Sequence, residues 1–239
     1  MGCSGCTRKG GDDTAGGCEA RKAPQRAELD ALLARLYPTS AWGHPDDDAR
    51  FGAGVRPGEV TRLAQALAVA CRAPTFVRDG GDEDQCAYVY VLCVGRTPCL
   101  LDVRDERAPA QLGEGEERVR ERYLRVALST AARLATVQEV VFEADRIATG
   151  PLAGALEIRE LPRPGVYDAV LLKRMRAAVD LLLASDLLHV DFGLLDVPLA
   201  GADDALYRER FGTAPHLVNY LFYAAPPTTS SVMLLDPPH

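Results

Sequence analysis

The sequence has few aromatic residues and no long uninterrupted apolar stretch. Aromatic side chains make up 6% of the 239 residues, and only one of them is a tryptophan. No run of about 18 apolar residues occurs, the length that a membrane-spanning helix needs. No secretory signal opens the chain, so we expect a cytosolic protein. Since 47% of the residues are hydrophobic and 26% are charged, the chain can bury a sizeable core in one domain.

The common signatures of catalysis and of nucleic-acid binding are also missing. The chain contains no GxSxG, GxxxxGK or HExxH motif. Its formal net charge is −7 and no basic stripe alternates with aromatic residues, which argues against a nucleic-acid partner. Seven cysteines without an export signal argue against a disulfide framework. We therefore predict no catalytic residue, no metal site and no cofactor.

The first 24 residues differ in composition from the rest. They are rich in glycine and cysteine and have almost no large apolar side chain. Such a segment cannot bury enough surface to offset the entropy of ordering it. We predict a disordered tail at 1–24 and a single α/β domain at 25–239.

An imperfect acylation signal lies at the start of this tail. Gly2 could accept a myristoyl group after removal of the methionine, although Cys6 stands where serine or threonine is usual. A second acyl chain on Cys3 or Cys6 would make the membrane attachment stable. We predict lipidation at Gly2, Cys3 and Cys6. Two alternatives stay open: a featureless leader, or a zinc site that adds Cys18.

The most extended apolar pattern lies at 166–190. Apolar residues recur there at steps of three and four, the spacing of one helical face. They are Leu172, Met175, Val179, Leu182 and Leu183. We predict a central core helix with this face buried and with Arg174 pointing away from it.

Shorter patterns predict the other elements. We expect helices at 25–37, 59–70, 116–135 and 202–211. We expect strands at 75–78, 87–94, 99–103, 137–142, 155–160 and 232–235, and either type at 216–223. Cys71 and Cys93 fall in apolar segments, where cysteine packs as a small hydrophobe. The order of elements predicts an α+β fold: a single compact mixed domain with a central long helix and a small, mostly antiparallel sheet.

Two His-x-Asp pairs offer an alternative function. His44 with Asp46 and His189 with Asp191 could supply imidazole and carboxylate ligands in a metal-dependent hydrolase. The simpler interpretation places His189 at a helix C-terminus, where a cation is favourable.

A series of short motifs follows the long predicted helix. The chain reads Leu-His-Val-Asp-Phe at 188–192 and Leu-Phe-Tyr-Ala-Ala-Pro-Pro-Thr-Thr-Ser-Ser at 221–231. The matching residues are His189, Val190, Leu221, Phe222, Ala224, Pro226, Ser230 and Ser231. With these motifs the last third of the chain resembles the herpesvirus cytoplasmic envelopment protein 1 family, tegument proteins from the seventh gene of the unique long region.

This resemblance implies a single α/β domain without catalysis. It implies a role in virion assembly, during the cytoplasmic (secondary) envelopment of capsids by Golgi-derived membranes. It also implies a stable complex with a palmitoylated, helical tegument protein. The expected locations are the host cytoplasm, Golgi-associated membranes and the virion tegument. An unrelated lipid-anchored cytosolic scaffold stays open as a further alternative.

Apolar residues around the matching motifs exceed what the short final elements need for their own burial. We predict that they bind a partner's amphipathic helix in an apolar groove. They are Phe192, Leu194, Leu195, Leu217, Leu221 and Phe222. Ordinary core packing is the competing interpretation for each of them.

Acylation can be tested on protein expressed in eukaryotic cells. We expect mass spectrometry of the N-terminal peptide to show added acyl mass. The substitution Gly2→Ala should move the protein towards the soluble fraction, because the first anchor is lost. An unmodified N-terminal peptide would contradict the predicted sites.

Overall fold

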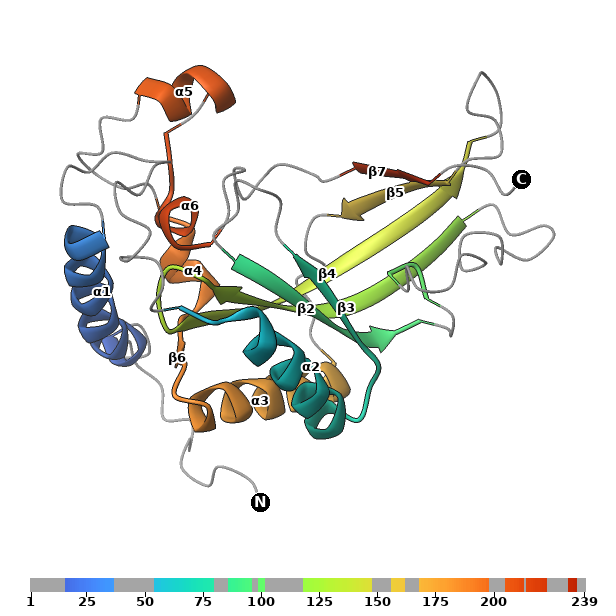
Figure 1. Ribbon diagram of the computed structural model, residues 1–239, viewed down its shortest axis with the longest axis horizontal. Helices are drawn as coiled ribbons and strands as arrows, with labels where there is room; N and C mark the ends of the chain where they lie inside the picture. The colour runs from blue at the N-terminus through green and yellow to red at the C-terminus, as the bar shows by residue number, and fades with distance from the viewer. Residues whose placement is uncertain are drawn as a thin grey trace, which may run out of the picture.

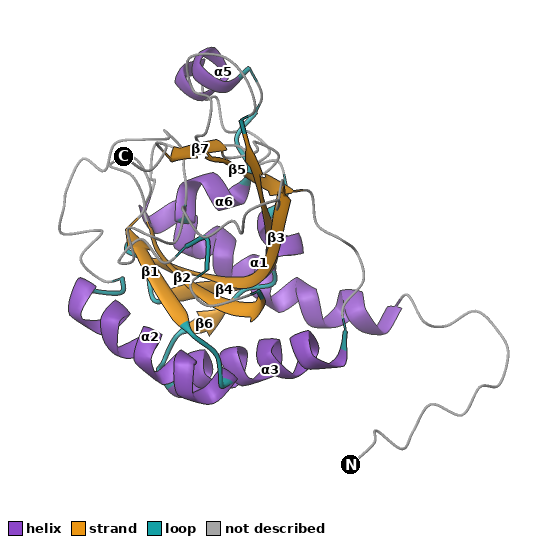
Figure 2. Ribbon diagram, turned by 90° about the vertical axis from the view of Figure 1, so that its right-hand side faces the viewer, coloured by secondary structure: helices purple, strands orange, loops and turns teal. Residues whose placement is uncertain are grey.

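A seven-stranded sheet lies between two groups of helices (Figures 1 and 2). The computed structural model describes residues 16–36, 54–79, 86–95, 99–101, 118–147, 156–161, 168–197, 205–212, 214–222 and 232–235. The predicted α+β class with a mostly antiparallel sheet is confirmed. The predicted lipidation sites Gly2, Cys3 and Cys6, and also His44, lie outside the described residues.

The sheet has the strand order β1-β2-β3-β4-β5-β7, with β6 beside β4. Its strands are β1 (Thr75–Asp79), β2 (Cys86–Val94), β3 (Arg118–Ser129), β4 (Leu134–Arg146), β5 (Leu156–Leu161), β6 (Leu188–His189) and β7 (Val232–Leu235). The described pairs are antiparallel except for β4 with β6. The helices are α1 (Gly16–Leu36), α2 (Pro57–Cys71), α3 (Ala169–Ala184), α4 (Phe192–Leu195), α5 (Ala205–Phe211) and α6 (Leu217–Leu221). None of these described helices is long and apolar enough to cross a membrane.

Helices α2 and α3 cover one face of the sheet. Every second residue of a strand points to the same face, and on β3 that alternation directs Leu124, Val126 and Leu128 towards the two helices. Val60, Leu63 and Leu67 of α2 belong to the same buried cluster. The predicted helix at 59–70 is thus confirmed as α2.

Helix α3 buries part of the predicted face: Leu182 is buried as predicted, but the buried side is turned towards Leu171 and Ala178. Leu171, Ala178 and Leu182 are buried, whereas Leu172 and Leu183 are 40% and 52% exposed. Met175 and Val179 are half-buried at the edge of the contact. Apolar residues occupy more than one side of this helix, so spacing alone did not define the buried side. The helix begins after Asp168, whose carboxylate accepts a hydrogen bond from the Leu171 N–H (2.8 Å).

Arg174 lies on the buried side of α3 and turns inward, contrary to the prediction. Its guanidinium donates to the carbonyl oxygens of Cys71 (3.2 Å) and Cys93 (2.7 Å). It thereby joins the end of α2 to the end of β2, and satisfies backbone acceptors that would otherwise be left at these ends.

The predicted helix at 116–135 is wrong, because this segment forms β3 and the turn into β4. Val119, Tyr123 and Val126 fit a helical spacing, but Arg118, Arg120 and Arg122 alternate with the period of a strand. The strand expected at 99–103 is also absent where it is described, since 99–101 form a turn. Strand β2 pairs with β1 and β3 instead.

The other sequence predictions agree more closely with the structure. Strands β1, β2, β4, β5 and β7 each contain or overlap a predicted strand, and α5 overlaps the predicted helix at 202–211. The segment left open at 216–223 contains helix α6. Helix α1 begins at Gly16, so its first turns fall within the predicted tail; residues 1–15 lie outside the described residues.

Two neighbouring leucines of α3 test its orientation. Leu182→Ala should lower the free energy of unfolding by about 2–5 kcal/mol, because it leaves a cavity in the core. Leu183→Ala removes the same atoms from an exposed position and should change the free energy of unfolding by less than about 0.5 kcal/mol. Chemical denaturation of both variants measures the difference. Equal losses would mean that α3 is rotated relative to the described packing.

Candidate functional site

The residues predicted to bind a partner lie in a buried cluster on the second face of the sheet. Phe192 and Leu195 come from α4, Leu217 and Leu221 from α6, and Phe222 follows α6 directly. All five are buried, and Leu194 is half-buried at the edge of the cluster. They therefore do not form the open surface that the sequence led us to expect.

Helix α1 covers this cluster. Leu29, Leu33 and Leu36 are buried in the same cluster as the α4 and α6 residues. These leucines are four and three residues apart, the spacing of one helical face. In Figure 1, α1 lies along the outer side of α4 and α6. We give the name α1 site to the part of this cluster that other elements contribute, which includes Phe192, Leu195, Leu217, Leu221 and Ala132.

Only side chains of one helix face attach the described part of α1 to the site. The opposite face is exposed at Glu28, Ala31 and Arg35. The polar side-chain contact described for α1 is the ion pair of Arg26 with Asp30, within the helix itself (2.9 Å). Burying a leucine contributes roughly 1.5–3 kcal/mol before the entropy of ordering the helix is subtracted. Apolar burial thus accounts for the attachment of α1.

Polar contacts fix the short helices that form the site. The Asp191 carboxylate accepts from the Gly193 N–H (2.7 Å) and caps α4. At the start of α6, His216 Nδ1 lies 2.8 Å from a carboxylate oxygen of Asp196. At its end, the Ser129 hydroxyl donates to the Leu221 carbonyl (2.6 Å). None of these contacts involves α1, so the site is held in place by other parts of the chain.

Of the two His-x-Asp pairs, only His189 with Asp191 lies among the described residues, because His44 and Asp46 lie outside them. His189 lies in β6, beyond the end of α3, so the interpretation as a helix C-terminal cation is wrong. Burial lowers the pKa of His189, and the Asp191 carboxylate opposes that shift, which favours the neutral imidazole at pH 7. Asp191 caps α4 instead. In the described part of the chain, no group of three histidine, cysteine or acidic side chains could hold a metal ion.

Cys71 and Cys93 lie on either side of Arg174, where α2, β2 and α3 meet. Both are free thiols in the apolar cluster beneath α2 and α3. Burial and then the neighbouring Cys93 raise the pKa of Cys71 to about 11. The nucleophilic form of cysteine is the thiolate, so Cys71 stays unreactive at neutral pH. Both act as packing residues, as predicted.

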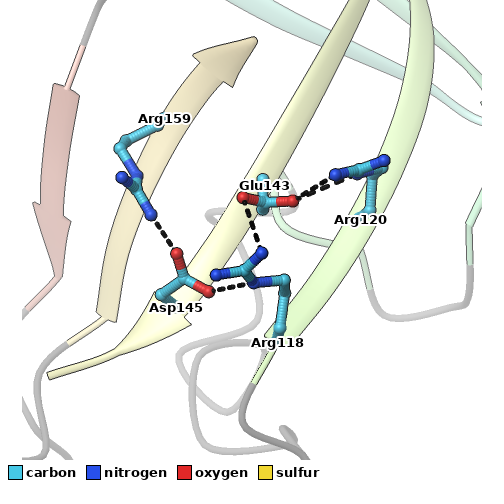
Figure 3. A network of polar contacts seen from close by, with 5 residues as sticks. All are labelled: Arg118, Arg120, Glu143, Asp145 and Arg159. Atoms are coloured by element: carbon cyan, nitrogen blue, oxygen red, sulfur yellow. Dashed lines mark hydrogen bonds and ion pairs between the residues drawn. The ribbon is translucent and has the colours of Figure 1, made fainter. Parts of the chain in front are cut away.

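A row of ion pairs joins strands β3, β4 and β5 (Figure 3). Arg120 of β3 binds Glu143 of β4 (2.6 Å), and Arg118 binds Asp145 (2.7 Å). Arg159 of β5 also pairs with Asp145. Burial alone would raise the pKa of Asp145, but hydrogen bonds from Arg118 and Arg159 outweigh it, so its pKa is lowered. Ionised Asp145 therefore stabilises the fold at any pH above the pKa that this carboxyl has in the unfolded chain. The stabilisation is lost as the pH falls through the lower pKa of the folded state.

The same row continues towards α3. Arg122 binds Glu139 (2.7 Å) and the helix-capping Asp168 (3.0 Å). Each arginine of the row lies opposite a carboxylate, so the charges cancel within it. We interpret the row as a sheet face on which more exposed arginines cover buried glutamates and hold the strands together. The α1 site is the better candidate for function.

Comparison with known proteins gives no relative from which a function could be transferred. No protein-family model, curated protein or solved structure matches this chain. The sequence had indicated the α4 and α6 side of the α1 site but not its occupant. The leucine spacing at Leu29, Leu33 and Leu36 predicted the helix itself, but the sequence did not indicate what this face packs against.

Two glutamates of β4 test how far the ion pairs stabilise the sheet. The side chains of Glu139 and Glu143 are 1% and 6% exposed, but their partners Arg122 and Arg120 are 23% and 59% exposed. Glu139→Gln should cost about 2 kcal/mol, because it leaves the half-buried Arg122 with the exposed Asp168 as its described ion-pair partner. Glu143→Gln should cost about 1 kcal/mol or less, because water can solvate Arg120. Equal costs in urea unfolding would contradict this account.

Proposed function

We propose that this chain is a non-enzymatic adaptor that binds an amphipathic helix of a partner protein at the α1 site. The observation that carries the proposal is the packing of α1 itself. A helix with leucines at positions i, i+4 and i+7 lies on α4 and α6 there, held by apolar side chains. This is the chemistry of helix-in-groove recognition, in which apolar anchors at those spacings enter a hydrophobic surface.

The resemblance of the last third of the chain to herpesvirus cytoplasmic envelopment protein 1 gives this adaptor a biological setting. The partner would be the palmitoylated, helical tegument protein, and the complex would promote secondary envelopment and virion assembly. Some of the residues that carry the resemblance belong to the cluster at the α1 site, namely Val190, Leu221 and Phe222. This coincidence links the resemblance to the surface proposed for binding.

Membrane attachment would follow from the partner's palmitoyl group, from acylation at Gly2, Cys3 and Cys6, or from both. Two lipid anchors on one complex hold a membrane far more firmly than one. The proposed adaptor therefore acts in the host cytoplasm, at Golgi-associated membranes and in the virion tegument.

Leu194 offers the most direct test, because it lies at the edge of the α1 site and is only half-buried. The chain is co-expressed with the palmitoylated helical tegument protein of the same virus, and the complex is isolated by size exclusion. Leu194→Glu should weaken this complex at least tenfold, because a carboxylate at an apolar contact is left without a partner.

The matched control is Leu183→Glu, which introduces the same charge at an exposed leucine of α3 on the other side of the sheet. This variant should bind as well as the wild type. A complex that survives Leu194→Glu unchanged, or a wild-type chain that forms no complex, would contradict the proposed function.

A further inference from the structure

We infer that helix α1 is an intramolecular ligand of the α1 site, which a partner's amphipathic helix must displace before it can bind. This inference rests on the proposed function of the site as a receptor for helices. It adds a regulatory step, because in the free chain α1 occupies the site and a partner helix has to displace it. The structure supports it through three features: the attachment of α1, the independence of the site, and the point where the chain is next anchored.

The contacts described between α1 and other elements are apolar. Its described side chains contribute Leu29, Leu33 and Leu36 to the buried cluster, and its described ion pair joins two residues of the same helix. A second helix with apolar residues at the same spacing would replace each leucine contact by an equivalent one. Among the contacts described for α1, exchange of one helix for another therefore breaks no hydrogen bond or ion pair to another element.

The site itself does not depend on α1 for its shape. Helix α6 is held at its start by the Asp196–His216 contact and at its end by Ser129. The Leu217 N–H also donates to the carbonyl of Val197, after α4 (3.0 Å). These contacts keep α4 and α6 against the sheet when α1 leaves, so a preformed surface remains for the incoming helix.

The chain is anchored again at Gly54 and Val55, before helix α2. The Val55 N–H donates to the Ser129 carbonyl (2.9 Å). Gly54 lies so close to Thr130 that an added Cβ would fall 2.2 Å from its carbonyl carbon. Displacement of α1 therefore stops at this anchor and does not reach α2 or the sheet.

Both helices use the same apolar surface, so they cannot occupy it together. A helix that belongs to the same chain competes at a high effective concentration, because its attachment keeps it near the site. Weakening the hold of α1 should therefore increase the affinity for any external helix of the same chemistry. A helix that merely completed the core, or that helped to bind the partner, would give the opposite result.

The test uses the full-length chain and a fluorescent synthetic peptide with the sequence of residues 16–36. The double variant Leu29→Ala with Leu33→Ala weakens the apolar attachment of α1 and keeps a high helix propensity. The control Leu183→Ala removes the same atoms from an exposed leucine. Anisotropy should show that the peptide binds the double variant at least tenfold more tightly than the wild type or the control.

Several results would overturn the inference. Equal peptide binding by all three proteins, or no binding to the double variant, would show that α1 is not in competition for the site. Loss of the cooperative thermal transition and the native circular dichroism in the double variant would make α1 an integral part of the core. A wild-type dimer that the double variant does not form would mean that α1 occupies the site of a second copy.

The tegument partner separates this inference from the proposed function. If α1 is an intramolecular ligand, the double variant should also bind that partner several-fold more tightly than the wild type. Equal or weaker partner binding by the double variant overturns the inference and leaves the adaptor function standing. Peptide binding by the double variant, with no partner binding by any variant, supports the inference and contradicts the proposed function.

Discussion

The hydroxyl and carbonyl groups of Ser129 join the parts of the molecule on which the candidate site depends. The hydroxyl accepts from the N–H groups of Ala131 and Ala132 and so closes the turn between β3 and β4. The same hydroxyl donates to Leu221 at the end of α6, and the Ser129 carbonyl accepts from Val55 ahead of α2. Because this residue is fully buried, each of these bonds replaces one to water and is costly to lose. One short turn thus positions helices on both faces of the sheet.

The β3–β4 hairpin is longer than the helices that cover it, so part of its surface is not covered by a helix. Its two ends carry different kinds of side chain. Near the turn, apolar residues such as Leu124 and Val126 pack beneath α2 and α3. At the far end the same face carries arginines opposite carboxylates (Figure 3). The aliphatic parts of arginine side chains can cover a sheet surface while their charged ends stay hydrated. An exposed sheet face is therefore kept from becoming an apolar patch that would aggregate.

The candidate site could be predicted in part. The surplus of apolar residues in the last third of the chain predicted a groove for a partner's helix, whereas in the structure these residues are buried with leucines of the chain's own helix α1. The sequence did not indicate that the covering helix is α1, because Leu29 and Leu221 are far apart along the chain. Contacts of this range follow from the order of the strands and from where the short helices are fixed, and neither is encoded in a local pattern.

The sequence by itself determined the α+β class, helix α2 and strand β2, because each of these segments matches one local period and is bounded by turn residues. Only the tertiary structure decided the segments that fit two patterns. The residues of β3 satisfy a helical spacing as well as a strand spacing, and pairing with β2 and β4 selected the strand. The buried side of α3 includes Arg174, whose guanidinium donates to the carbonyl of Cys71, 103 residues away. A contact over that distance along the chain exists only once the chain has folded, so the spacing of apolar residues could not reveal it.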